Sequence, residues 1–233
     1  MNPIIAEILR TRNARAREGG ISTEEGGFLQ EIVMEIRPRI SLETGFAYGI
    51  SALFICEALQ KVKGKKHFVI DPNQNSSYEG NGIRNIKKAK YDNLVEFIEV
   101  PSEVALPDLL RQRTRIDLAF IDGVHTFDHA LIDFFYINRM LNVGGAVIFD
   151  DANWPSISRL CRYVSRYPCY KTHASWPARR NLWALTIVAK TFEYLATRQT
   201  KLWKDDMSIF GRRCVVFKKI KEDDRNYDWY REF

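Results

Sequence analysis

Five short apolar runs, continuous rather than alternating with polar residues, constrain the fold of this chain more than any other feature. Such runs are typical of parallel strands that helices cover on both faces. Helical apolar patterns at 50–62 and 127–141 lie between them, and this alternation predicts a doubly wound α/β sheet. The five predicted strands occupy residues 39–44, 67–71, 95–100, 116–122 and 145–151.

The flanking segments add helices before this core and strands after it. Two N-terminal helices are predicted, at 3–17 and from Ser22 to Pro38, and Ser22 with Glu25 has the spacing of a capping box. Two more helices, at 156–167 and 180–197, and two more strands, at 169–174 and 212–220, are expected after the fifth strand.

These elements predict one domain, 1–233, with a mostly parallel, seven-stranded sheet. Its parts are the extra N-terminal helices (1–38), a cofactor-binding core (39–151) and a C-terminal part of the sheet on the acceptor side (152–233).

The composition argues against several classes of protein. No run approaches the ~18 apolar residues of a membrane span, and the first twenty residues lack the apolar stretch of a signal peptide. Four scattered cysteines without a C-x-x-C pair argue against zinc and disulfides, which predicts a cytoplasmic protein with reduced thiols. The net charge of +6 comes from short clusters near expected helix ends, so nucleic acid is an unlikely partner.

Carboxylates end four of the five predicted strands. These acids are Glu43, Asp71, Asp122 and the adjacent pair Asp150 and Asp151. Ligands of open α/β sheets bind beyond the carboxyl ends of the strands, so the set predicts an acidic cleft. Two neighbouring carboxylates repel each other, and a cation in the cleft would offset that repulsion.

The turn after the first strand, LETGFAYGIS (42–51), has the form of a ligand-binding loop. Gly45 and Gly49 are four residues apart, so the turn lacks the close glycine pair of a dinucleotide fingerprint. Backbone N–H groups at the start of the next helix suit an anionic group. With Glu43 just before Gly45, the loop predicts a ligand that has both a carboxylate and a cationic part.

These residues resemble the class I methyltransferases that use S-adenosylmethionine, and most closely the catechol-type and macrocin-type O-methyltransferases. The motif E-x-G-x-x-x-G after the first strand is the cofactor motif of that family. The stretches that carry the resemblance run in order over residues 42–151: ETGFAYGIS, VIDPN, PSEVALPDLL, FIDGVHTFDHALID and LNVGGAVIFDD. The resemblance implies a Rossmann-like methyltransferase fold and O-methylation of a small acceptor such as a sugar, phenol or secondary metabolite.

The resemblance also implies a set of cofactor-binding residues. They are Glu43, Gly45, Gly49, Ser51, Asp71, Ser102, Glu103 and Asp122. Gly45 and Ser51 would hold the methionine end of the cofactor, and Glu43 would shape the turn beneath it. Asp71 would accept hydrogen bonds from both ribose hydroxyls. Ser102 and Glu103 would flank the adenine, although Pro101 stands where many members of the family have glycine.

At the other end of the cleft, the resemblance implies a divalent metal held by Asp122, Asp150 and Asp151. Oxygen ligands suit a hard cation, and Mg²⁺ is the usual choice when substrate oxygens complete the coordination. Many metal-dependent members have asparagine at the last position, where this chain has aspartate. Alternatively, Asp150 caps the next helix and Asp151 is solvated, and some relatives with the same strand ending work without metal.

Catalytic roles are expected for Asp122 and for His125, which follows it by three residues. Metal-dependent relatives have a lysine base at the matching position, and many macrocin-type relatives have histidine. Histidine titrates near neutral pH, which suits a general base. His129 is the rival candidate, and a role of His125 in capping the helix near Phe127 is the structural alternative.

Other functions remain open from the sequence. They are a metal-independent methyltransferase that acts on nitrogen or RNA, a nicotinamide-dependent oxidoreductase, and an inactive binding module on the same fold. The aromatic residues Trp154, Trp176 and Trp183 and the tail NYDWYREF could line an acceptor pocket. More often such residues belong to a core or a subunit interface, and a homo-oligomer is therefore possible.

Overall fold

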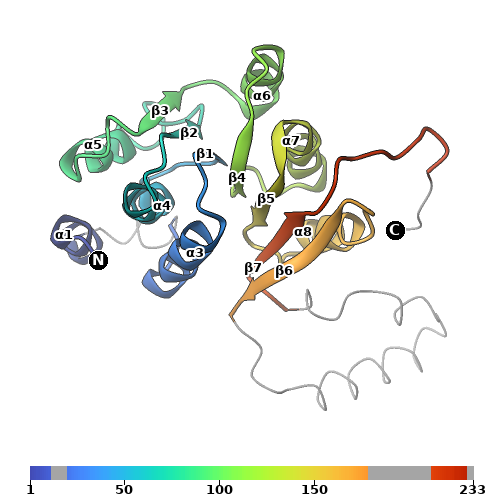
Figure 1. Ribbon diagram of the computed structural model, residues 1–233. Helices are drawn as coiled ribbons and strands as arrows, with labels where there is room; N and C mark the ends of the chain where they lie inside the picture. Colours follow the sequence, from blue (N-terminus) through green and yellow to red (C-terminus); the bar gives the residue numbers. More distant parts are fainter. Residues whose placement is uncertain (12–19, 178–210, 230–233) are drawn as a thin grey trace.

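The computed structural model describes residues 1–11, 20–177 and 211–229. Its centre is a seven-stranded sheet in the order β3-β2-β1-β4-β5-β7-β6 (Figure 1). The first five strands are parallel, and β7 runs antiparallel to both of its neighbours. The strands are β1 (Ile40–Thr44), β2 (Lys66–Ile70), β3 (Val95–Ile98), β4 (Ile116–Ile121), β5 (Leu141–Phe149), β6 (Tyr170–Trp176) and β7 (Cys214–Lys219). The predicted seven-stranded α/β sheet is confirmed.

Helices cover both faces of this sheet, and each face has its own apolar core. One face carries α1 (Pro3–Thr11), α3 (Thr23–Ile36), α4 (Ile50–Lys61) and α5 (Asn81–Lys88). The other carries α6 (Ser102–Arg111), α7 (Phe127–Met140) and α8 (Pro155–Val164). The helix predicted at 180–197 and the second half of the one predicted at 3–17 lie outside the described residues. No described helix combines the length and the apolar character that a membrane span requires.

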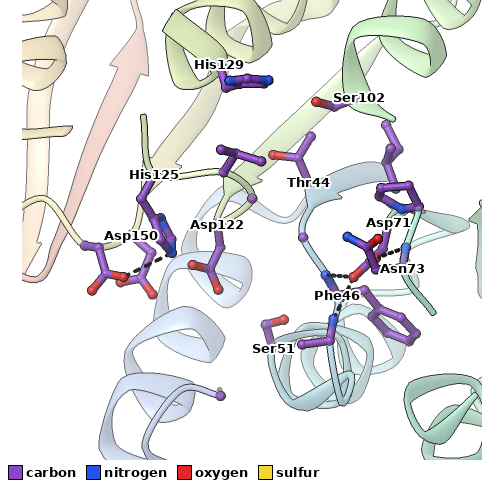
Figure 2. Close-up of a pocket in the computed structure, with 18 of the residues that line it drawn as sticks. Thr44, Phe46, Ser51, Asp71, Asn73, Ser102, Asp122, His125, His129 and Asp150 are labelled. Carbon is purple, nitrogen blue, oxygen red and sulfur yellow. Dashed lines mark hydrogen bonds and ion pairs between the residues drawn. The ribbon is translucent and has the colours of Figure 1, made fainter. Parts of the chain in front are cut away.

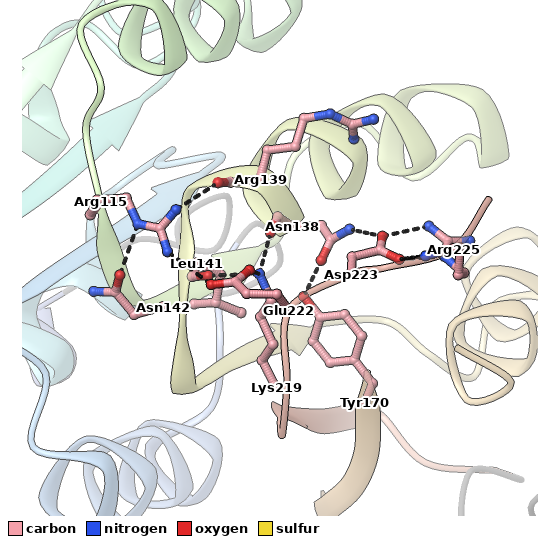
Figure 3. A network of polar contacts seen from close by, with 10 residues as sticks. All are labelled: Arg115, Asn138, Arg139, Leu141, Asn142, Tyr170, Lys219, Glu222, Asp223 and Arg225. Atoms are coloured by element: carbon pink, nitrogen blue, oxygen red, sulfur yellow. Dashed lines mark hydrogen bonds and ion pairs between the residues drawn. The ribbon is translucent and has the colours of Figure 1, made fainter. Parts of the chain in front are cut away.

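The junction between α7 and β5 differs from the prediction. The fifth strand was expected at 145–151, but it begins at Leu141, directly after the helix, and ends at Phe149. Lys219, almost fully buried in β7, donates from Nζ to the carbonyls of Asn138 and Leu141, each at 2.9 Å (Figure 3). A buried ammonium group thus satisfies carbonyls where the helix ends, and the chain needs no separate capping loop there.

The capping box predicted at the start of α3 is present. The backbone N–H of Glu25 donates to the Ser22 hydroxyl at 3.1 Å, and the backbone N–H of Ser22 donates to the Glu25 carboxylate at 3.5 Å. Helix α3 packs against α4 through Gly26. A Cβ atom at Gly26 would lie 2.4 Å from the Phe54 ring, whereas one at Gly27 would meet nothing within 4 Å.

This difference between adjacent glycines gives the first prediction. Gly26→Ala should destabilise the fold by about 1–3 kcal/mol, because the added methyl group overpacks the contact between α3 and α4. Gly27→Ala should be neutral or stabilise by up to about 1 kcal/mol, because alanine has the higher helix propensity. Chemical denaturation of both variants measures this, and equal effects would contradict the packing of α3 on α4.

Candidate active site

The acids converge because one ladder of backbone hydrogen bonds aligns the strand ends. The N–H of Asp71 donates to Ile98 O on β3, that of Asp122 donates to Thr44 O on β1, and that of Asp150 donates to Ile121 O on β4. After β1, the residue at the same level of this ladder is Gly45, whose N–H donates to Ile70 O on β2. Asp71, Asp122 and Asp150 therefore stand level at the carboxyl edge of the sheet.

Glu43 lies elsewhere. It is two residues before the ladder position, inside β1, where it pairs with Val69 and Phe120 in the sheet. Its side chain is fully buried, 3.6 Å from Nε2 of His67, and it does not line the cleft. The acidic edge thus contains the acids of β2, β4 and β5 but not that of β1, because the strand runs one residue beyond the acid, to Thr44.

A cleft of about 480 Å³ opens at this edge, and the turn after β1 forms one of its walls. Gly45 has a φ of +85°, and a Cβ atom there would lie 2.0 Å from the Asp122 carbonyl oxygen, so only glycine fits. The Asp71 carboxylate accepts from the N–H groups of Phe46 at 2.9 Å, Ala47 at 2.8 Å and Asn73 at 2.7 Å (Figure 2). Asp71 therefore fixes the path of the turn.

The cleft contains most of the expected cofactor residues. Gly45, Ser51, Asp71, Ser102, Glu103 and Asp122 all line it. Gly49 does not line it but stands in the left-handed conformation just before α4, so Ser51 lies in the first turn of that helix. Asp133 of α7 was not expected: it is buried beside Thr44 and Ser102, and burial raises its pKa. The one feature of the sequence that could have indicated Asp133 is that an acidic residue lies on the apolar face of the helix predicted at 127–141.

At the other end of the cleft, Asp122, His125 and Asp151 form a compact group. One ligand atom from each lies within 4.8 Å of the others, and Nε2 of His125 is 3.4 Å from Oδ2 of Asp151. Burial, and then the charges of Asp150 and Asp151, raise the pKa of Asp122 well above its usual range. A positive charge at this place would relieve that repulsion, so the donor set fits a cation.

Asp150 does not join this group, although the sequence placed it there. Its carboxylate belongs instead to a buried cluster with Glu25 of α3 and Cys214 of β7, whose Sγ donates to Glu25 at 3.0 Å and to Asp150 at 3.2 Å. Nε of Arg213 lies 3.1 Å from the Glu25 carboxylate. Burial and then Glu25 raise the pKa of Asp150 to about 7. We call Glu25, Asp150, Arg213 and Cys214 the inner cluster.

The alternatives for the two histidines can be compared directly. His125 is not the N-cap of α7, because that position is Thr126 and no side chain caps the helix there. His129 bonds the Thr126 hydroxyl through Nδ1 at 2.9 Å, and Figure 2 shows it apart from Asp122 and His125.

The half-exposed Trp154 ring lies 5.0 Å from that of His125, next to the cleft. Trp229 packs on Tyr163 and Tyr167, so this part of the tail belongs to the core, and Trp183 lies outside the described residues.

Comparison with known proteins gives a consistent result. A family model described as a methyltransferase domain matches residues 42–152. Two Arabidopsis thaliana proteins are similar: one named for caffeoyl-CoA O-methyltransferase activity, 28% identical over 138 residues, and tapetum-specific methyltransferase 1, 27% identical over 151 residues. The matches cover 58% and 64% of this chain, and they span 55% and 62% of the length of these relatives.

Solved structures share the fold. An O-methyltransferase from Bacillus cereus, in complex with SAH, has a TM-score of 0.63 and 20% identity over 74% of this chain and 83% of its own. The O-methyltransferase TomG from Streptomyces achromogenes, in complex with SAM, has a TM-score of 0.61 and 18% identity over 74% of this chain and 82% of its own. The expected Rossmann-like methyltransferase fold is confirmed.

The inner cluster gives a prediction for stability. Because the pKa of Asp150 is raised from 3.8 to about 7, the folded protein retains a proton that the unfolded chain releases at lower pH. The stability that this proton contributes is complete below pH 3.8 and is lost as the pH rises through about 7. Asp150→Asn, which stays neutral, should therefore gain about 1–3 kcal/mol relative to the wild type between pH 5 and pH 8.

Denaturation in the presence of a chelator measures this difference, with Asp92→Asn at an exposed position as the control. A gap between Asp150→Asn and the wild type that does not change with pH would contradict the raised pKa of Asp150.

Proposed function

We propose that this chain is an S-adenosylmethionine-dependent O-methyltransferase acting on a small hydroxylated acceptor, and the match of residues 42–152 to a methyltransferase-domain model supports this proposal. The observation that carries the proposal is a single cleft with two different ends. One end has the glycine turn braced by Asp71, and the other has Asp122, His125 and Asp151. The many carboxylates at the second end favour a small neutral acceptor over RNA, whose phosphates they would repel.

At the first end, the residues would bind the cofactor, which supplies a methyl group on a positively charged sulfur. The N–H groups at the start of α4 and the Ser51 hydroxyl suit the methionine carboxylate. Asp71 already accepts three backbone hydrogen bonds, and a carboxylate has about four acceptor sites. It would therefore accept one hydrogen bond from the ribose hydroxyls rather than two. Ser102 and Glu103, at the start of α6, would flank the adenine.

At the second end, the residues would align and activate the acceptor hydroxyl. The imidazole of His125 would receive its proton, and the Asp151 carboxylate, 3.4 Å from Nε2, would stabilise the imidazolium that results. Asp122 and Asp151 would hold a divalent cation, with Mg²⁺ favoured by the oxygen donors. Such a cation, when bound, would lower the pKa of the acceptor hydroxyl. Methyl transfer then depends on holding the oxygen in line with the methyl group and the sulfur.

The cofactor assignment is tested by calorimetry with S-adenosylhomocysteine. Asp71→Ala should weaken binding by about 1.5–3 kcal/mol, because the variant loses both the ribose contact and the brace of the turn. Asp92→Asn, at an exposed position, should bind like the wild type. Unchanged affinity in Asp71→Ala, or tight binding of NAD by the wild type, would refute the assignment.

The catalytic assignment is tested by the pH–rate profile with a small phenol as acceptor. His125→Ala should lose at least about 10²-fold in kcat and the acidic limb of the profile, with cofactor affinity intact. His129→Ala is the matched control and should keep the shape of the profile, because His129 lines the cleft but bonds Thr126 and stands apart from Asp122 and His125. A His125→Ala variant that retains most of its kcat would exclude His125 as the base.

A further inference from the structure

The backbone of Asp151 adopts a conformation that its surroundings must enforce. Its φ is +47°, in the left-handed region that residues other than glycine rarely occupy. Six other non-glycine residues of the described chain share a positive φ, so what distinguishes Asp151 is the set of contacts that hold the backbone on both sides of it. Here the turn directs the Asp151 carboxylate towards Asp122 and His125, while Asp150, one residue earlier, enters the inner cluster.

Strand β7 and the segment before it hold this turn from one side. The N–H of Ala152 donates to Arg213 O at 2.7 Å, and the N–H of Arg213 donates to Trp176 O at 2.9 Å. The Cys214 thiol donates to the Asp150 carboxylate at 3.2 Å. The residues on both sides of Asp151 are thus tied to consecutive residues of one segment.

Helix α3 holds the turn from the other side through a single residue. Glu25 is fully buried, and its two carboxylate oxygens meet the Cys214 thiol at 3.0 Å and Arg213 Nε at 3.1 Å. Arg213 Nε also lies 3.7 Å from Asp150 and 3.9 Å from Asp151. Removing the Glu25 carboxylate would take away the nearest anion of the Arg213 guanidinium and the nearer of the two acceptors of the Cys214 thiol.

We propose that Glu25 is a positioning residue of the active site, which holds the inner cluster so that the Asp151 carboxylate faces Asp122 and His125. Helix α3 lies outside the segment that matches the methyltransferase model, so the site is completed by a residue that the domain match does not include. The inference rests on the proposed function, because the experiment detects the position of Asp151 through the binding of a cation at the proposed site.

A merely structural role of Glu25 can be separated from this one. Glu25 also belongs to the capping box, so its loss could act only by fraying α3. Ser22→Ala removes the side-chain cap and keeps the carboxylate in the inner cluster. Glu25→Gln keeps one acceptor oxygen, which can face Arg213, and places an amide nitrogen beside Cys214 and Asp150, whereas Glu25→Ala removes every contact.

The experiment is a titration of each full-length variant with Mn²⁺, in which the paramagnetic resonance signal of free Mn²⁺ reports the bound fraction. Glu25→Ala should weaken Mn²⁺ binding about 10- to 100-fold, as loss of a residue that orients a metal ligand does, and Glu25→Gln and Ser22→Ala should stay within about threefold of the wild type. Calorimetry with S-adenosylhomocysteine on the same samples should give equal affinities, and this also verifies that each variant is folded.

The outcomes separate the inference from the proposed function. Wild-type affinity in Glu25→Ala, equal losses in Glu25→Ala and Ser22→Ala, or an equal loss in Glu25→Gln would overturn the positioning role. A wild type that binds S-adenosylhomocysteine but no Mn²⁺ would also overturn it and leave the cofactor assignment intact. A wild type that binds Mn²⁺ with the expected order of variants, but no S-adenosylhomocysteine, would support the inference and refute the proposed cofactor.

Discussion

The hydrogen bonds from the Asp71 carboxylate to the turn after β1 are the interaction on which the geometry of the cleft depends. The turn must bring Gly45 against the Asp122 carbonyl, closer than any side chain would allow. Its next two N–H groups would face an open cleft without a partner, and unpaired buried N–H groups are costly. One carboxylate oxygen satisfies both of them, from a neighbouring strand. The strand order β2-β1-β4 places Asp71 and Asp122 on either side of the turn after β1, and in this way it determines the shape of the binding site.

The acceptor end follows a different principle, because there the protein gathers like charges that it could have kept apart. Burial raises the pKa values of Asp122, Asp150 and Asp151, and neighbouring carboxylates raise them further: Asp150 and Asp151 act on Asp122, Asp150 acts on Asp151, and Glu25 acts on Asp150. Such a cluster is costly unless protons or cations neutralise it. The Arg213 guanidinium lies nearest the inner cluster, 3.1 Å from Glu25 and 3.7 Å from Asp150, and it reaches the group of Asp122, His125 and Asp151 only at 3.9 Å from Asp151. This asymmetry is why the second group, and not the first, suits an exchangeable metal.

The edge of the sheet could be predicted from the sequence because it depends on local rules. An apolar run that ends in an acid gives both the strand and the side chain at its carboxyl end, and parallel pairing makes those ends level. The prediction failed for Glu43, which also follows an apolar residue. The strand continues past it, and the pattern of apolar residues alone does not specify the last rung of the ladder.

The inner cluster could not be predicted in the same way. Cys214 lies 189 residues from Glu25 and 64 from Asp150 along the chain, and the contact exists only because β7 inserts antiparallel between β5 and β6. Glu25 was assigned to the capping box, and that assignment is correct. Its backbone N–H and its carboxylate both bond Ser22 in the capping box, and the same carboxylate also meets Cys214 and Arg213; only the local partner leaves a pattern in the sequence.

The side chains of the two adjacent acids that follow β5, Asp150 and Asp151, leave the backbone in different directions. In a regular strand, neighbouring side chains point to opposite faces of the sheet. Here the strand ends at Phe149, Asp150 takes the last rung, and the left-handed backbone at Asp151 turns the chain before it could continue. Both acids border the cleft, but Asp150 is buried against Glu25 and Cys214, whereas Asp151 faces Asp122 and His125. The fold offsets the charge of Asp150 within the inner cluster, whereas a ligand bound in the cleft can offset the charge of Asp151. The pair therefore links the stability of the fold to the chemistry of the cleft.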